Sequence, residues 1–222
     1  TKMFTAALGM KLDDRGTVDR TAPLSTILPH VNDTAPFDTP MTLHHLMSHT
    51  AGYPTTNSAG GSVSTADLAV YFDGHREETL WSPPGAVFNY SNVGMSLAGL
   101  ALQEADGRPF GTLVEEEIFT PAGMVHASMD AGQVESEGNF AFGHSGSVTS
   151  TTVVAPNDGY LATGYYGPMG GAWGSAEDLA RWALVHLEAG GDVMSEAAMA
   201  EVQRAHSSTG RLPGQQTGYG LF

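Results

Sequence analysis

The sequence contains no cysteine. This absence excludes disulfide frameworks, thiolate zinc sites and cysteine nucleophiles, and it leaves the redox compartment open. Long apolar runs are missing too, since no stretch reaches the roughly 18 apolar residues that span a bilayer. The first residues show no basic region followed by an apolar one, so the sequence predicts neither a membrane span nor a signal peptide within it.

Positive charge is scarce. Lysine and arginine number 9 against 24 aspartate and glutamate residues, which gives a formal net charge of -15. A surface with this surplus of carboxylates repels phosphate backbones, which argues against nucleic acid as a partner. At 222 residues and 41% hydrophobic composition, the chain can still form one large or two small packed domains.

Helical patterns dominate the chain. The segment from Thr1 to Gly16 is apolar on nearly every face and predicts a buried helix that stops near Gly16. A short helix is predicted from Thr42 to about Ser48, with Thr42 as its N-cap. Between residues 132 and 174, glycine, serine, threonine and aromatic residues indicate loops and short strands. Further helices are predicted at Ser64 to Phe72, Ser91 to Ala105, Phe110 to Phe119, Ser175 to Glu188 and Ser195 to His206, and Ser64 with Asp67 and Ser175 with Asp178 match the capping box.

Both ends of the chain lack the signals that normally bound an element. The first predicted helix begins without a preceding cap, and the last residues, "GYGLF", are typical of the start of a strand. We therefore expect the chain to be a segment of a longer protein.

The stretch "FNYSNVG" follows the turn-forming "WSPPGA" and precedes a predicted helix. Such a turn can project Tyr90 and Asn92 from the scaffold into a cleft. A capping role for Ser91 or Asn92, with Tyr90 as a hydrophobic staple, explains the triplet as well. Chance alone supplies about 0.2 Tyr-x-Asn triplets in a chain of this composition, so the triplet by itself is a weak signal.

The second candidate is Lys2, one of only two lysines with Lys11. In the first turn of a buried helix, burial and the positive end of the helix dipole both lower the pKa of a lysine. Such a lysine can serve as the general base for a nucleophile one turn earlier on the same face. Alternatively, the ammonium simply reaches solvent at the helix end.

Several sequence blocks together carry a family resemblance. They are "TKMFTAALGMKLDDRGTV", "ILP", "MTLHHLMSHTAGYP", "SPPGAVFNYSNVGMSLAG", "IFTPAGM" and "MGGAWGSAEDLARW". In order and spacing they resemble the serine β-lactamase-like family, the class C β-lactamase and penicillin-binding-protein-like group that also holds esterases and D-amino-acid peptidases. The resemblance covers almost the whole chain.

The resemblance implies an α/β fold of the β-lactamase/transpeptidase type, in which an antiparallel sheet flanked by helices adjoins an all-helical region. This chain would cover mainly the helical part and lack the first and last sheet strands. It would form part of one catalytic domain. The expected parts are a nucleophile helix and loop at 1–35, a helical and loop region at 36–174, and helices returning to the sheet at 175–222.

The family's motifs map onto few positions of this chain. In its Ser-x-x-Lys motif, Lys2 matches the lysine, which places the expected nucleophilic serine two residues before Thr1. Its Tyr-x-Asn motif corresponds to Tyr90 and Asn92. The third motif, Lys-Thr-Gly or His-x-Gly, is expected beyond Phe222.

A second "His-x-Gly" sequence lies inside the chain, at His144 to Gly146. It precedes the "GGAWGS" block, at a place where the family has a loop. We interpret it as a coincidence.

The implied reaction is acyl transfer. The serine would attack a carbonyl and form an acyl-enzyme, with Tyr90 near Lys2 assisting proton transfer and Asn92 orienting Lys2 and the substrate. The substrate would be a small-molecule ester, β-lactam or peptide, and no cofactor or metal is expected. The segment alone would then be inactive. Candidate pocket residues are Tyr53, Tyr165, Tyr166 and Trp173, each equally plausible as a buried loop anchor.

Three other interpretations stay open. His45 and His49 have the spacing of a zinc-enzyme helix, but Leu46 occupies the place of the required glutamate. Thr1 would be a nucleophile with its own α-amine as base if it were a processed terminus. A non-catalytic, β-lactamase-like binding module is the third interpretation. The resemblance favours a periplasmic or extracellular location without excluding the cytoplasm, and the oligomeric state stays open.

Overall fold

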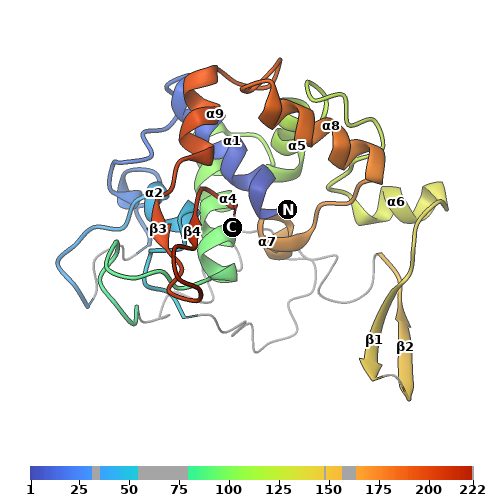
Figure 1. Cartoon of the computed structure of the whole chain (residues 1–222), viewed down its shortest axis with the longest axis horizontal. Helices are drawn as coiled ribbons and strands as arrows, with labels where there is room; N and C mark the ends of the chain where they lie inside the picture. The colour runs from blue at the N-terminus through green and yellow to red at the C-terminus, as the bar shows by residue number, and fades with distance from the viewer. Residues whose placement is uncertain (32–35, 55–79, 148, 157–163, 222) are drawn as a thin grey trace.

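The computed structural model describes residues 1–31, 36–54, 80–147, 149–156 and 164–221. Its helices gather around two long central ones, α1 (Lys2–Asp14) and α4 (Asn92–Asp106) (Figure 1). The other α-helices are α2 (Leu43–Met47), α5 (Phe110–Val114), α6 (Ala131–Glu137), α7 (Gly167–Gly170), α8 (Ala176–Leu187) and α9 (Glu196–Gln203). The shorter turns are η1 (Leu24–Thr26), the π-helical η2 (Glu115–Phe119) and η4 (Gly164–Tyr166).

The predicted helix starts are confirmed where they can be compared. Thr42 caps α2, with its hydroxyl accepting from the backbone N–H of His45 at 3.3 Å. Ser175 and Asp178 form the expected capping box at the start of α8. The helix predicted at Ser64 to Phe72 lies outside the described residues.

One expectation about secondary structure is confirmed only in part, and another is not met by the described residues. The region from 132 to 174 holds the helices α6 and α7 as well as strands, because Asp130 caps α6 by accepting from the backbone N–H groups of Gly132 and Gln133. A seven-residue helix with glycine in its first turn carries too little apolar periodicity to be recognised. At the other end, residues 219 and 220 form a bend, and residues 218–221 are not part of a strand.

The described residues contain few strands. β1 (Gly143–Ser147) and β2 (Ser150–Val154) form an antiparallel hairpin that projects away from the helices (Figure 1). β3 (Ser207–Ser208) and β4 (Gln216–Thr217) form a second, very short pair. His144 lies on the exposed hairpin opposite Val153, so its "His-x-Gly" sequence is remote from the packed helices.

The core is centred on α1, which packs against α4 and α9 and is buried along most of its length, as its sequence predicts. The ring of Phe4 on α1 meets the edges of Phe119 and Trp182, with ring centroids 5.0 and 5.1 Å away. These contacts fasten η2 and α8 to α1. Among the described residues, no helix is long and apolar enough to cross a membrane.

Close packing joins α4 to α7. Gly99 on α4 lies so near Pro168 that a β-carbon at position 99 would come within 2.2 Å of the proline Cγ atom. Only glycine permits this approach, which brings residues 164–172 against the two central helices. We call residues 164–172 the α7 segment.

A polar cluster around Tyr219 connects the second half of the chain to the first. Tyr219 is fully buried, its hydroxyl bonds to His44 Nδ1 at 2.5 Å, and the ring of His206 stacks on it with centroids 3.7 Å apart. Arg20 also donates to the Tyr219 hydroxyl, and its guanidinium pairs with Asp13 at 2.6 Å. The hydroxyl therefore accepts from Arg20 and donates to a neutral His44.

This cluster makes the protonation of His44 unfavourable in the folded state. Burial, with smaller contributions from His45, His206, Arg20 and Arg204, lowers the pKa of His44 from 6.5 to about 4. A proton on Nδ1 would also remove the acceptor for the Tyr219 hydroxyl.

The first prediction concerns the packing of α4 on α7. Gly99→Ala should lower the free energy of unfolding by about 1–3 kcal/mol, because the new methyl group overlaps Pro168. Gly94→Ala, in the same helix, meets nothing nearer than 3.5 Å and should stabilise by up to about 1 kcal/mol through helix propensity. Urea denaturation of both variants measures the difference, and equal effects would contradict the packing described.

The second prediction concerns pH. The unfolded chain binds more protons than the folded one between pH 6.5 and about 4, because the folded pKa of His44 is depressed. Stability is therefore fully present above pH 6.5 and is lost as the pH falls, and Tm should drop by roughly 5 °C between pH 7 and pH 4.5.

His44→Asn should make Tm depend less steeply on pH without abolishing the dependence, because buried His49 also has a lowered pKa, whereas His144→Asn on the exposed hairpin should leave the dependence unchanged. Thermal unfolding followed by circular dichroism at several pH values supplies the comparison. Parallel curves for the two variants would show that His44 is not responsible.

Candidate active site

Three side chains from the central helices hold the backbone of the α7 segment. Lys2 Nζ donates to the Met169 carbonyl at 2.6 Å, and the Thr5 hydroxyl donates to the Pro168 carbonyl at 2.6 Å. From α4, the Ser96 hydroxyl donates to the Tyr165 carbonyl at 2.6 Å. Thr5 and Ser96 are buried, so these bonds satisfy carbonyl groups that water cannot reach. The ammonium of Lys2 is thereby fixed at the start of α1.

The structure brings Lys2 and Tyr90 together. Lys2 Nζ lies 4.9 Å from the centroid of the Tyr90 ring, within the range of a cation–π contact. Tyr90 is half-buried on the turn before α4, and Asn92 is the half-buried first residue of that helix. Ser91 caps the helix by accepting from the backbone N–H of Gly94 at 3.0 Å. The capping role therefore belongs to Ser91, and Tyr90 and Asn92 flank it.

His49 organises the turn that carries Tyr90. Its backbone carbonyl accepts from the N–H of Asn89 at 2.7 Å, and its Nδ1 atom accepts from the N–H of Ser91 at 3.2 Å. Its ring lies 4.7 Å from the Tyr90 ring at an interplanar angle of 33°. The Asn89 side chain adds a bond to the Tyr53 carbonyl at 2.7 Å.

His49 is 1% exposed, and burial followed by the charge of Lys2 lowers its pKa from 6.5 to about 3. Because Nδ1 accepts a hydrogen bond, the single ring proton of the neutral form lies on Nε2. Sequence reasoning considered His49 as half of a zinc motif and as part of one block of the family resemblance. No pattern in the sequence shows that it faces residues 89–91.

The four aromatic residues expected near a pocket differ in position. Tyr53 and Tyr165 are buried in the core, where their backbone carbonyls accept the bonds described above. Tyr166 is half-buried beneath Gly170, where a β-carbon would come within 2.6 Å of the phenol ring. Trp173 pairs through its backbone with Ser128, and its side chain is half-buried. Burial favours the loop-anchor interpretation for Tyr53 and Tyr165.

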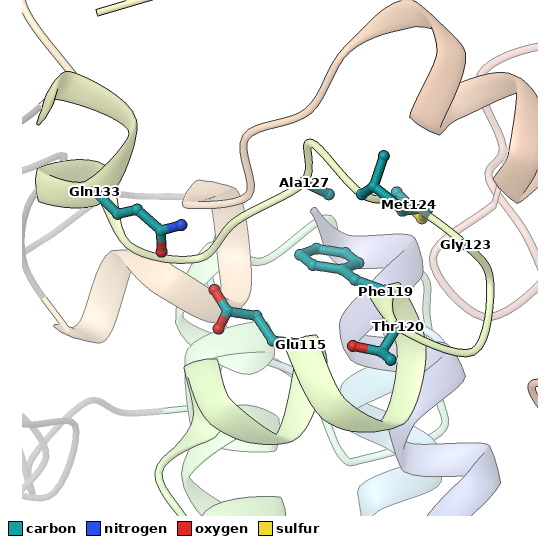
Figure 2. A pocket seen from close by; sticks show the side chains of 8 residues that line it. Glu115, Phe119, Thr120, Gly123, Met124, Ala127 and Gln133 are labelled. Atoms are coloured by element: carbon teal, nitrogen blue, oxygen red, sulfur yellow. The ribbon is translucent and has the colours of Figure 1, made fainter. Parts of the chain in front are cut away.

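A separate pocket of about 250 Å³ lies beside η2. Figure 2 shows Glu115 and Gln133 on its polar side and Phe119 and Met124 on its apolar side. Glu115 Oε1 accepts from the Met129 N–H at 2.8 Å, so this carboxylate fixes the following loop. Lys2, Tyr90 and Asn92 do not line this pocket. Its lining residues are Glu115, Phe119, Thr120, Gly123, Met124, Val125, Ala127 and Gln133.

The geometry also bears on the other interpretations. His45 Nδ1 accepts from the backbone N–H of Thr42 at 3.2 Å, whereas His49 faces Tyr90, so the two imidazoles serve different turns. Within the described residues, no group of three His, Cys, Asp or Glu side chains could hold a metal ion. The Thr1 hydroxyl accepts from the backbone N–H of Ala172 at 2.9 Å, beside the α7 segment.

Comparison with known proteins identifies the family. The sequence model of the Beta-lactamase family matches residues 1–222. The chain belongs to this family. Among curated proteins, the D-alanyl-D-alanine-carboxypeptidase/endopeptidase AmpH of Escherichia coli K12 is 34% identical over 133 residues, which are 56% of this chain and 34% of that protein.

Solved structures show the shared fold of the beta-lactamase family. The octameric penicillin-binding protein homologue from Pyrococcus abyssi matches with a TM-score of 0.83 at 22% identity, covering 99% of this chain and 51% of its own. EstCE1, described as a hydrolase with promiscuous acyltransferase activity, matches with a TM-score of 0.81 at 19% identity. This match covers 99% of the present chain and 66% of the EstCE1 chain. The chain thus spans about a third of the carboxypeptidase and half of the archaeal protein.

Proposed function

We propose that this chain supplies part of the active site of a serine hydrolase that works through an acyl-enzyme. The observation that supports it most directly is the position of the Lys2 ammonium over the Tyr90 ring, where the starts of α1 and α4 meet. Membership of a family of serine hydrolases supports the reaction class. The nucleophile in this proposal is a serine two residues before Thr1, which would stand one helical turn from Lys2.

The proposed reaction has two halves. The serine oxygen attacks the substrate carbonyl while its proton passes to the member of the Lys2 and Tyr90 pair that is deprotonated at that moment, and the leaving group departs with that proton. Water then attacks the acyl-enzyme, which releases the acid and restores the serine. Asn92, at the first position of α4, hydrogen-bonds the substrate and orients it.

The substrate class is proposed from the relatives. They include a D-alanyl-D-alanine carboxypeptidase and a hydrolase with acyltransferase activity. We propose an ester or an amide substrate, the latter being a β-lactam or a D-amino-acid peptide. If the position two residues before Thr1 holds no serine, a non-catalytic binding module becomes the better proposal.

The third prediction tests the nucleophile in the longer protein. That protein should hydrolyse short-chain p-nitrophenyl esters faster than a chromogenic cephalosporin. Replacing the serine two residues before Thr1 with alanine should lower kcat by at least roughly 1,000-fold, because the covalent route is lost.

Mass spectrometry of the protein after brief exposure to an ester should locate the acyl group on that serine. An acyl group on Thr1 would instead favour the N-terminal threonine mechanism. Faster turnover of the cephalosporin would assign a β-lactamase, and the absence of any turnover would refute the hydrolase proposal.

The fourth prediction separates catalysis by Tyr90 from packing. Tyr90→Phe keeps the ring against His49 and Lys2 and removes only the hydroxyl. It should lower kcat by roughly 100-fold to 10,000-fold with little change in Tm, because proton transfer is impaired.

Tyr219→Phe is the matched control. It removes a buried hydroxyl that bonds to His44, so it should lower Tm and leave kcat close to that of the unmodified protein. Steady-state kinetics and thermal unfolding of both variants supply the four values needed. Near-normal turnover by Tyr90→Phe would remove this phenol from the mechanism.

A further inference from the structure

One residue, His49, makes three separate contacts with the turn at 89–91. Its carbonyl accepts from the Asn89 N–H, its Nδ1 atom accepts from the Ser91 N–H, and its ring lies against the Tyr90 ring. Three consecutive residues are therefore positioned by one residue that precedes them by about forty positions. The contacts include the backbone on both sides of Tyr90, so the phenol's place in space depends on His49.

The backbone of His49 is held in an uncommon conformation. Its φ angle is 57°, in the left-handed region that residues other than glycine seldom adopt. His49 follows Ser48, the C-cap of α2. This conformation allows the carbonyl and the imidazole of the same residue to face the turn at 89–91.

The imidazole can perform this role only in one protonation state. Nδ1 must be unprotonated to accept from the Ser91 N–H, since a proton there would place two donors against each other. Burial and the nearby Lys2 charge keep the pKa of His49 near 3, so the accepting form persists over the whole range in which a hydrolase would work. Among the contacts described, the titratable groups near its ring are Lys2 and Tyr90.

We infer that His49 is a positioning residue for Tyr90: its neutral imidazole, protonated on Nε2, and its left-handed backbone hold the phenol beneath the Lys2 ammonium. The inference rests on the proposed function, in which Tyr90 takes part in proton transfer. His49 is given no contact with substrate. It acts through the geometry of the turn, whose displacement by about 1 Å can cost 100-fold in rate.

Two variants separate positioning from simple stability. His49→Gly removes the ring and the acceptor, yet glycine adopts the left-handed backbone without strain, so the turn at 49 can still form. His49→Asn also tolerates this backbone and carries an amide oxygen at nearly the place of Nδ1, so it restores the acceptor for the Ser91 N–H.

In the longer protein, His49→Gly should lower kcat by about 10-fold to 100-fold while KM changes by less than about 3-fold. His49→Asn should recover kcat to within about 5-fold of the unmodified protein. The control is His186→Asn, which removes a half-buried imidazole from α8 and should leave both constants unchanged. All constants are measured at a temperature where circular dichroism shows each variant to be folded.

A purely structural role gives another pattern. It would lower Tm in His49→Gly but leave kcat of the folded protein unchanged. An unchanged kcat in His49→Gly would overturn the inference, and so would a kcat in His49→Asn that is no higher than in His49→Gly.

Nitrogen-15 NMR of the histidine rings tests the same inference without activity. It should show His49 with an unprotonated Nδ1, a protonated Nε2 and no titration between pH 5 and pH 8. A protonated Nδ1, or titration near pH 6.5, would overturn the positioning role even in an active enzyme. An inactive unmodified protein with the expected NMR signals would instead refute the proposed function, and with it the catalytic consequence of this contact.

Discussion

Buried hydrogen bonds to the α7 segment are the constraint on which the rest of the structure depends. The carbonyl groups of Tyr165 and Pro168 lie where solvent cannot satisfy them, and Ser96 and Thr5 donate to them from two different helices. A buried carbonyl without a partner costs about 1–3 kcal/mol, so neither hydroxyl can be lost cheaply. The same segment receives Lys2, which ties the candidate catalytic ammonium to the packing of α1 against α4.

The helices could largely be predicted from the sequence because their signals are local. Thr42, Ser91, Ser175 and Ser195 each cap a helix within three residues of themselves. α6 escaped prediction because its cap, Asp130, precedes a stretch with few apolar residues and two glycines at its bounds. An aspartate followed closely by glycine is equally typical of a turn, so the cap at Asp130 could not be distinguished from a turn in this glycine-rich sequence.

The candidate site also contains residues that the sequence could identify and one that it could not. Motifs alone single out Lys2, Tyr90 and Asn92, and the structure places Lys2 Nζ 4.9 Å from the centroid of the Tyr90 ring. The place of His49 could not be found, since it follows from tertiary packing between α2 and the turn before α4. No periodicity or spacing encodes a left-handed backbone at a histidine or the direction of its ring.

Tyr219 shows the same limit. Its sequence neighbours suggest a strand, whereas the structure buries its side chain between His44 and His206. A tyrosine placed in this way connects the region after α9 to α2, and its burial raises its pKa to about 12. Long-range polar contacts of this type depend on the completed fold and leave no local trace in the sequence.

The exposed hairpin of β1 and β2 has a different physical character from the helices. Almost all of its residues are exposed, and its pairing from Gly143 with Val154 to Ser147 with Ser150 is held by backbone bonds and by a bond from the Thr151 hydroxyl to the Ser147 carbonyl at 3.1 Å. A two-stranded ribbon without a packed face is marginally stable in water. The hairpin is therefore a separate unit of local unfolding, whose amide hydrogens can exchange with solvent while the helical core stays closed.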